Sequence, residues 1–146
     1  MRKKGWAMPG LLVDMSDIKF ILFDLLETQH LFSHEKFSNW NEKAFHLILE
    51  EARRFAEKRL FPLNIEGDRI GARFVEGQVY SVPGTKEAYR DFAEGGWLTS
   101  CEAESMGGQG LPKILKFTTH EMFLAANFPF MCYVNLSHDA AKLIEL

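Results

Sequence analysis

The segment from residue 39 to residue 61 most constrains the fold of this chain, because its apolar side chains recur at helical spacing. Charged side chains fill the positions between them, so one face is apolar and the other is solvated. We expect a helix that begins near Asn39, with Asn39 and Glu42 as a capping box, and ends at Pro62, which would clash with the preceding turn. The apolar positions are Phe45, Ile48, Leu49, Ala52, Phe55 and Ala56.

Four further helices are predicted from the same spacing, and nothing indicates a sheet. The first runs from a cap at Ser16 or Asp17 to Glu27, and another begins at Thr85 and ends at the Gly95-Gly96 pair. Two more follow, at residues 112–127 and 130–146, with Pro129 between them. Residues 64–82 indicate irregular chain with one short extended piece at residues 78–82. The predicted fold class is therefore all-α, an orthogonal or up-down bundle of about five helices.

The first predicted helix is apolar on most sides, and a helix of this kind must be covered on most sides. Two interpretations remain open, namely packing between subunits or domains, and a central core helix of one domain. Its apolar residues are Ile18, Phe20, Ile21, Leu22, Phe23, Leu25 and Leu26.

Composition excludes several classes of protein. A chain of 146 residues with 47% hydrophobic side chains can bury a core, so one compact domain is expected. A formal net charge of -3 argues against a nucleic-acid partner, which requires clustered Lys and Arg. Cys101 and Cys132 have neither disulfide nor metal spacing, which fits a reducing compartment, and we expect a cytoplasmic protein.

The N-terminal residues do not have the pattern of a targeting segment. Pro9, Asp14, Asp17 and Lys19 interrupt the apolar residues that follow Arg2, so a signal peptide is not indicated. The longest apolar run, residues 20–26, contains Asp24 and is far shorter than the roughly 20 residues of a membrane span. We interpret residues 1–15 as a flexible arm.

Candidate chemical motifs are few. His30 and His34 have the spacing of zinc ligands but no third ligand, so no metal site is predicted. The glycine turn at residues 107–110 precedes a helix, yet it lacks the features of a phosphate-binding loop and is interpreted as an ordinary turn. Neighbours on a helix point about 100° apart, so Ser137-His138-Asp139 cannot form a hydrolase triad.

Glu121 and Trp97 are further candidates for a role in binding or catalysis. Glu121 lies among apolar residues, where burial would raise its pKa, but satisfaction by a neighbouring group is the simpler expectation. Trp97 follows a glycine pair and is expected to anchor the core rather than stack on a ligand ring. These residues on their own describe a helical module without an active site, so no catalytic residue is predicted.

Several short phrases occur along the chain in a fixed order. They are Asp17-Ile18-Lys19-Phe20, Leu60-Phe61-Pro62-Leu63-Asn64, Gly67-Asp68-Arg69-Ile70-Gly71, Gly95-Gly96-Trp97, Gly107-Gly108-Gln109-Gly110-Leu111-Pro112 and Glu121-Met122. In this order they resemble the N-terminal helical domain of the acyl-CoA dehydrogenases, and the first phrase resembles the leading helix of a longer-chain subgroup. The resemblance runs from about Asp14 to the last residue, with a departure at Ser105-Met106, where an acidic or polar residue and an aromatic are usual.

This resemblance implies a division of the chain and of the chemistry. Residues 1–15 would be the arm, 16–38 the extension helix and its connection, and 39–146 a helical domain that is incomplete at its C-terminal end. The flavin and the catalytic Glu would lie in β- and C-terminal domains that do not occur in this sequence. FAD is therefore expected in the complete enzyme and not on this chain alone.

The resemblance also implies a binding role for the last predicted helix. By position, Val134, Asn135, His138 and Asp139 resemble the segment that lines the end of the fatty-acyl pocket. The implied partners are an acyl-CoA thioester, the remaining domains or a second chain, further copies in a homo-oligomer, and an electron-transfer flavoprotein as electron acceptor. The alternative function is a non-catalytic helical interaction module. Either function predicts exposed apolar patches on the first and last helices.

Overall fold

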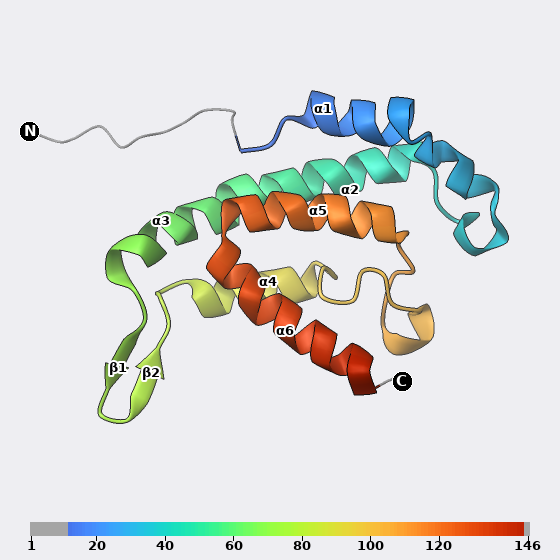
Figure 1. The fold of residues 1–146 in the computed structure, drawn as a ribbon. Coiled ribbons are helices and arrows are strands. Elements are labelled where there is room, and N and C mark those ends of the chain that lie inside the picture. Colours follow the sequence, from blue (N-terminus) through green and yellow to red (C-terminus); the bar gives the residue numbers. More distant parts are fainter. Residues whose placement is uncertain (1–11, 145–146) are drawn as a thin grey trace, which may run out of the picture.

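Helices make up most of the structure, which confirms the predicted all-α class (Figure 1). The computed structural model describes residues 12–144, apart from the side chains of residues 137, 139, 141 and 142. In Figure 1, α2 and α5 lie along one another, α1 runs along α2, and α6 crosses at an angle. The α-helices in this described range are α1 (Met15–Lys19), α2 (Glu42–Phe55), α3 (Phe61–Ile70), α4 (Thr85–Glu94), α5 (Lys113–Ala126) and α6 (Phe128–Ile144).

The first helix begins earlier than predicted, because Asp14 and not Ser16 or Asp17 is its cap. The Asp14 carboxylate accepts hydrogen bonds from the backbone N–H groups of Ser16 at 2.9 Å and Asp17 at 3.3 Å. The helix then continues as a π-helical segment, η1 (Phe20–Leu25). The arm predicted for residues 1–15 lies mostly outside the described residues.

This first helix lies on the surface of the fold and is not a central core helix. Leu22 is buried, whereas Phe20 and Leu25 are 56% and 64% exposed. Its packing against the core is therefore one-sided. Of the two interpretations left open above, the central core helix is excluded within this chain.

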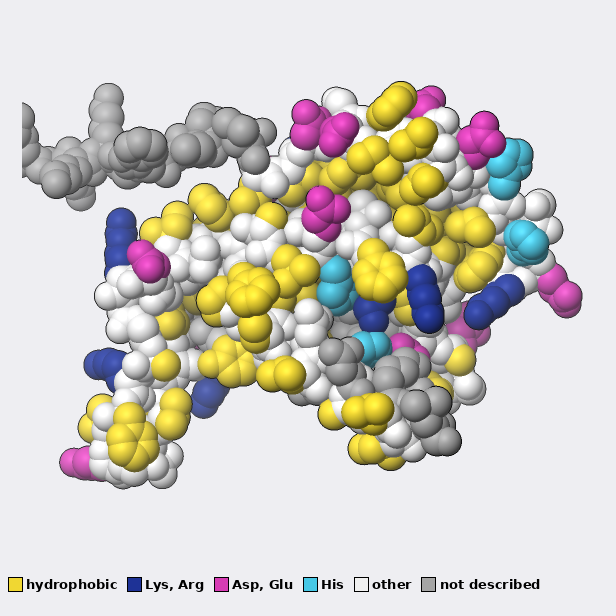
Figure 2. All heavy atoms as spheres, in the orientation of Figure 1, with side chains coloured by type: hydrophobic (Ala, Val, Ile, Leu, Met, Phe, Trp, Pro, Cys, Tyr) yellow, Lys and Arg dark blue, Asp and Glu magenta, His cyan; other side chains and the backbone are white. Residues whose placement is uncertain are grey.

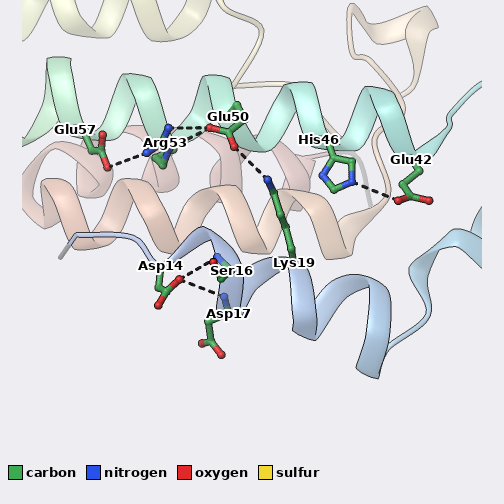
Figure 3. A network of polar contacts seen from close by, with 9 residues as sticks. All are labelled: Asp14, Ser16, Asp17, Lys19, Glu42, His46, Glu50, Arg53 and Glu57. Atoms are coloured by element: carbon green, nitrogen blue, oxygen red, sulfur yellow. Dashed lines mark hydrogen bonds and ion pairs between the residues drawn. The ribbon is translucent and has the colours of Figure 1, made fainter. Parts of the chain in front are cut away.

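An ion pair from Lys19 to Glu50 connects α1 to α2, and a second one, within α2, holds the same carboxylate (Figure 3). The Lys19 ammonium lies 3.3 Å from one carboxylate oxygen of Glu50, and the Arg53 guanidinium lies 2.9 Å from the other. Burial raises the pKa of Glu50, but the hydrogen bonds from Lys19 and Arg53 outweigh it, so the pKa is lowered overall. The carboxylate of Glu50 is thus held in its charged form between two cations.

Two short 3-10 helices, η2 (Thr28–Ser33) and η3 (Glu35–Phe37), occupy the connection that precedes α2. They shift the start of α2 past the predicted residue. Asn41 is extended and accepts a hydrogen bond from the Ala44 N–H at 2.9 Å, so Asn41 is the cap and the Asn39/Glu42 capping box was wrong.

Pro62 does not end the long helix, contrary to the prediction. The chain passes from α2 through a π-helical segment, η4 (Ala56–Leu60), directly into α3. Pro62 is in the first turn of α3, where a missing N–H is tolerated because those amides have no partner within the helix. The π segment thus restarts the helix and removes the conflict with proline.

A small hairpin follows α3 where irregular chain was predicted. Strands β1 (Arg73–Val75) and β2 (Gln78–Tyr80) pair antiparallel, so the expected extended piece is real but has a partner. Glu76 and Gly77 both have positive φ, at 50° and 78°, which is the geometry of a tight two-residue hairpin turn. All six strand residues are exposed, and the hairpin projects from the helices (Figure 1).

The break between α5 and α6 is made by Asn127 and not by Pro129. Asn127 leaves the helical conformation, at φ -158° and ψ 84°, and its side-chain oxygen accepts a hydrogen bond from the Phe130 N–H at 3.0 Å. Its side-chain nitrogen donates to the carbonyl of Leu60 in the π segment at 3.2 Å. Pro129 lies in the first turn of α6. Asn127 is buried and ties three elements together.

An aromatic cluster forms the centre of the core. The Phe92 ring packs edge-on against Phe123 and Phe130, with centroid distances of 5.2 and 5.7 Å. The Trp97 ring lies 5.2 Å from Phe123, which confirms that this tryptophan anchors the core. The Phe55 ring lies 5.8 Å from Phe92, so the rings join α2, α4, α5 and α6.

The loop between α4 and α5 folds on itself through backbone hydrogen bonds. The N–H of Gly108 donates to the Ala103 carbonyl at 3.0 Å, and the N–H of Gly110 donates to the Glu102 carbonyl at 2.8 Å. A Cβ at Gly108 would meet the Glu102 carbonyl oxygen at 2.1 Å. Only glycine fits at position 108, so the turn is structural and its amides serve the loop itself.

Two glycine substitutions are expected to have opposite effects. Gly108→Ala should lower the free energy of unfolding by about 1–3 kcal/mol, because the loop must open to admit the methyl group. Gly67→Ala should raise it by about 0.5–1 kcal/mol, since Gly67 lies within α3 and its Cβ would be 3.8 Å from Val82. Urea unfolding followed by circular dichroism measures both. A Gly108→Ala protein as stable as the parent would show that the loop is soft.

Candidate functional site

The four predicted pocket residues lie along the middle of α6. They differ from one another in how far their side chains are buried. Val134 is 2% exposed and belongs to the core, whereas Asn135 and His138 are half-buried. The side chain of Asp139 lies outside the described residues. The helix therefore presents Asn135 and His138 at the edge of the core, toward α5.

These two residues meet a polar cluster that consists of Glu102, Lys116, His120, Asn135 and His138. Lys116 on α5 donates a hydrogen bond from its ammonium to Nε2 of His138 at 2.8 Å. The same nitrogen lies 3.6 Å from a carboxylate oxygen of Glu102 in the loop before the glycine turn. The polar cluster thus joins α5, α6 and the loop at one place.

The environment of the polar cluster changes the titration of two groups. Burial lowers the pKa of His120, the charge of Lys116 lowers it further, and hydrogen bonds to the Lys116 carbonyl and the Asn135 side chain oppose them in part. Burial also raises the pKa of the Cys101 thiol, which is next to Glu102 in the loop. Cys101 is therefore a poor nucleophile and His120 favours its neutral form.

Of the Ser137-His138-Asp139 motif, the structure describes the side chain of His138. Its ring nitrogen is engaged by Lys116 and Glu102, which come from other elements of the fold. Glu121, considered above as a base in an apolar setting, is exposed on α5, so the expected burial was wrong. Helix α5 turns Met122 and Phe123 inward, and the preceding position at Glu121 outward.

Sequence reasoning missed three members of the polar cluster, Glu102, Lys116 and His120. A signal for two of them was present, because Lys116 and His120 are four residues apart and share a face of α5. Asn135 and His138 have the matching spacing of three on α6. Nothing in the sequence indicated that these two faces oppose each other, or that the loop delivers Glu102 between them.

A groove of about 400 Å³ opens at the start of α6, beside the hairpin. Phe130 is buried at its floor and Tyr133 is exposed at its edge, while Ser81 and Thr85 supply polar groups. A second hollow beside it shares these four residues and adds Lys86 and Tyr89. The two hollows adjoin at these shared residues, the first bordered by α3 and α6 and the second by α4 and α6, and the sequence predicted neither.

Large apolar side chains are exposed on the first and last helices, which confirms the predicted patches. On α6, Leu136 and Leu143 are 72% and 73% exposed. On the first helix, Phe20, Leu25 and Leu26 are more than half exposed. Figure 2 shows apolar side chains gathered over the first helix. Exposed apolar surface on two separate elements is typical of a protein that packs against further polypeptide.

The remaining sequence features concern metal ligands and membrane-spanning helices. His30 pairs with Glu27 at 3.4 Å, and both side chains are exposed. Among the side chains that the structure describes, no three His, Cys, Asp or Glu residues come together as a metal site. No helix in this described part of the chain combines the length and apolarity needed to cross a membrane.

Comparison with known proteins relates the chain to one class of enzyme. No family model matches it. It is 31% identical over 130 residues to a 3-methylmercaptopropionyl-CoA dehydrogenase of Ruegeria pomeroyi, which covers 89% of this chain and 22% of that protein. It is 29% identical over 136 residues to a broad-specificity linear acyl-CoA dehydrogenase, FadE5, of Mycobacterium tuberculosis, covering 91% of the chain and 22% of the relative. The chain thus spans about a fifth of the length of these two curated relatives.

Proposed function

We propose that this chain is the N-terminal helical domain of an FAD-dependent acyl-CoA dehydrogenase, where it forms one wall of the acyl pocket and surfaces for packing. One observation carries the proposal. Similarity to two acyl-CoA dehydrogenases extends over about nine tenths of the chain but only 22% of each relative. A helical bundle that corresponds to a fifth of such an enzyme is expected to depend on the rest of it for catalysis.

The exposed surfaces support this division of labour. The apolar side chains on η1 and α6 expose area that an isolated small domain would normally bury. In the proposed enzyme these surfaces pack against the flavin-bearing polypeptide and against further copies in a homo-oligomer. An electron-transfer flavoprotein would then accept electrons from the assembled enzyme.

The proposed pocket wall is the middle of α6, at Val134, Asn135, His138 and Asp139. A buried side chain such as Val134 would support the wall from behind, while Asn135 lies at its edge. A polar side chain at the end of an acyl pocket limits how far an alkyl chain can enter. The Asn135 amide has a hydrogen bond with His120, and an alkyl chain would bury its remaining donors and acceptors unpaired, at a cost of about 1–3 kcal/mol. Asn135 is therefore the residue that we expect to restrict acyl length.

The bound FAD would supply hydride acceptance, and a carboxylate outside these 146 residues would remove the α-proton of the thioester. This chain's own residues would exclude water and hold the alkyl chain straight. Neither task requires a titrating group on α6. The exposed Glu121 is not assigned a role in proton transfer.

The test begins with the chain isolated from its natural source under native conditions. We expect it to be isolated with a flavin-binding region related to the remaining four fifths of the acyl-CoA dehydrogenases, either on the same polypeptide or on a second one. The complex should be yellow and should bleach when acyl-CoA is added. A chain that binds flavin by itself would contradict the proposed placement of the cofactor. A chain isolated without any flavoprotein would favour the non-catalytic module.

Within that complex, Asn135→Val is expected to shift the ratio of kcat/KM values toward longer acyl chains by about tenfold, which corresponds to about 1.4 kcal/mol. Ala140→Ser is the matched control, because residue 140 is exposed and about 140° around the helix from residue 135. The control should leave the acyl preference unchanged. An unchanged preference in Asn135→Val would remove the pocket-wall assignment while leaving the identity of the domain intact.

A further inference from the structure

One ring nitrogen of His138 lies between two side chains of opposite charge. Nε2 is 2.8 Å from the Lys116 ammonium on α5 and 3.6 Å from the Glu102 carboxylate in the loop. Figure 1 places α5, α6 and this loop as separate segments of the fold. His138 is therefore the point at which α6 can be fastened either to a helix or to a loop.

Protonation decides which of the two contacts Nε2 can make. Without a proton it accepts a hydrogen bond, and the Lys116 ammonium offers only donors. The contact with Lys116 therefore requires the neutral tautomer that carries its proton on Nδ1. When both ring nitrogens carry protons, Nε2 is a donor in a cationic ring, which the Lys116 ammonium repels and the Glu102 carboxylate attracts. The two states are mutually exclusive because both contacts use the same nitrogen.

Both side chains of the His138–Glu102 contact are largely buried, which strengthens the interaction between them. The side chains of His138 and Glu102 are only 19% and 12% exposed, so their interaction is less screened than that of a surface ion pair. Charged or titratable groups face this site from two packed elements. They are Lys116 and His120 from α5, and Cys101 and Glu102 from the loop. Lys113 of α5 interacts with Cys101, and its own side chain is exposed. Among the described side chains of α6, the polar neighbour is Asn135.

We propose that His138 is a proton-controlled latch that fastens α6 to α5 through Lys116 when neutral, and to the loop through Glu102 when protonated. The inference rests on the two distances and does not depend on the proposed enzyme function. Imidazole is the side chain that ordinarily changes charge between about pH 5 and 8, so this is the range that the test must scan. Proton uptake would pull on the loop at Glu102.

The loop carries its own reporter of this pull. The Glu102 carbonyl accepts the N–H of Gly110 at 2.8 Å, so a displacement of Glu102 changes the environment of that amide. In the isotopically labelled 146-residue chain, NMR spectra recorded from pH 5 to 8 should show the His138 ring signals and the Gly110 amide moving with one midpoint. A Gly110 amide that ignores the titration of His138 would overturn the latch.

Substitution of the two partners should move this midpoint in opposite directions. Lys116→Met removes the contact of the neutral ring and should raise the midpoint by about 1 pH unit, whereas Glu102→Gln should lower it by about 1 unit. Lys116→Arg keeps the charge and should restore the parent midpoint. A shift of the same sign in both variants, or no shift in either, would refute the proposal.

The control for charge alone is Lys113→Met, the same substitution three residues earlier on α5. Lys113 is exposed, so we expect its loss to move the midpoint by less than about 0.3 pH unit. If Lys116→Met does not fold, as judged by its circular dichroism, Lys116→Gln provides the same loss of charge with a polar side chain. A shared midpoint of the His138 ring signals and the Gly110 amide in the parent chain tests the proposal without any variant.

Discussion

Replacing Phe92 with alanine is expected to lower the free energy of unfolding by about 3–5 kcal/mol. The side chain of Phe92 is fully buried, and its ring meets Phe55, Phe123, Phe130 and Trp97. The loss would leave a cavity among rings from four parts of the fold that cannot all move inward. Since domains of this size are stable by about 5–15 kcal/mol, much of the stability would be lost.

Urea unfolding measures this change, with circular dichroism and tryptophan fluorescence as separate probes. Phe117→Ala is the matched control, because the Phe117 side chain on α5 is 67% exposed. That variant should differ from the parent by less than about 1 kcal/mol. If both variants lost a similar free energy of unfolding, the position of Phe92 in the aromatic cluster would not explain its effect on stability.

The second large effect is expected at Asn127, where alanine should cost about 2–4 kcal/mol. The change removes the acceptor for the Phe130 N–H and the donor to the Leu60 carbonyl, and each buried group left unpaired costs about 1–3 kcal/mol. Asn127→Asp separates the two bonds, because a carboxylate still accepts from Phe130 but cannot donate to Leu60 when ionised.

In thermal and urea unfolding we expect the parent to be the most stable protein. Asn127→Asp and Asn127→Ala should both be well below it. Asn64→Ala is the control, since Asn64 is a half-buried residue of α3, and it should lie within about 0.5 kcal/mol of the parent. An Asn127→Ala protein as stable as the control would show that water replaces both lost partners.

Helical spacing alone was enough to predict the fold class and the amphipathic α2. It failed at residues whose role depends on distant parts of the chain. Pro62 looks like a helix terminator, yet the π segment before it resets the helix, and the Leu60 carbonyl finds its partner at Asn127, 67 residues away. No local pattern contains that contact.

The candidate site illustrates the same limit. Position on α6 could be predicted for Asn135 and His138, because a helical period assigns residues to faces. The partners of His138 could not, since they depend on how α5 crosses α6 and on the path of a loop held by its own backbone. Capping residues were misplaced for a related reason, because Asn39 and Asn41 are equally good candidates until the preceding 3-10 turns are known.

The projecting hairpin offers a practical handle on the molecule. Its turn at Glu76 and Gly77 lies at the tip of two exposed strands, away from the aromatic cluster and from the polar cluster. Exposed loop tips of this kind tolerate inserted sequence well. A short epitope or a fluorophore attachment site placed there would report on assembly with other polypeptides while leaving the core undisturbed.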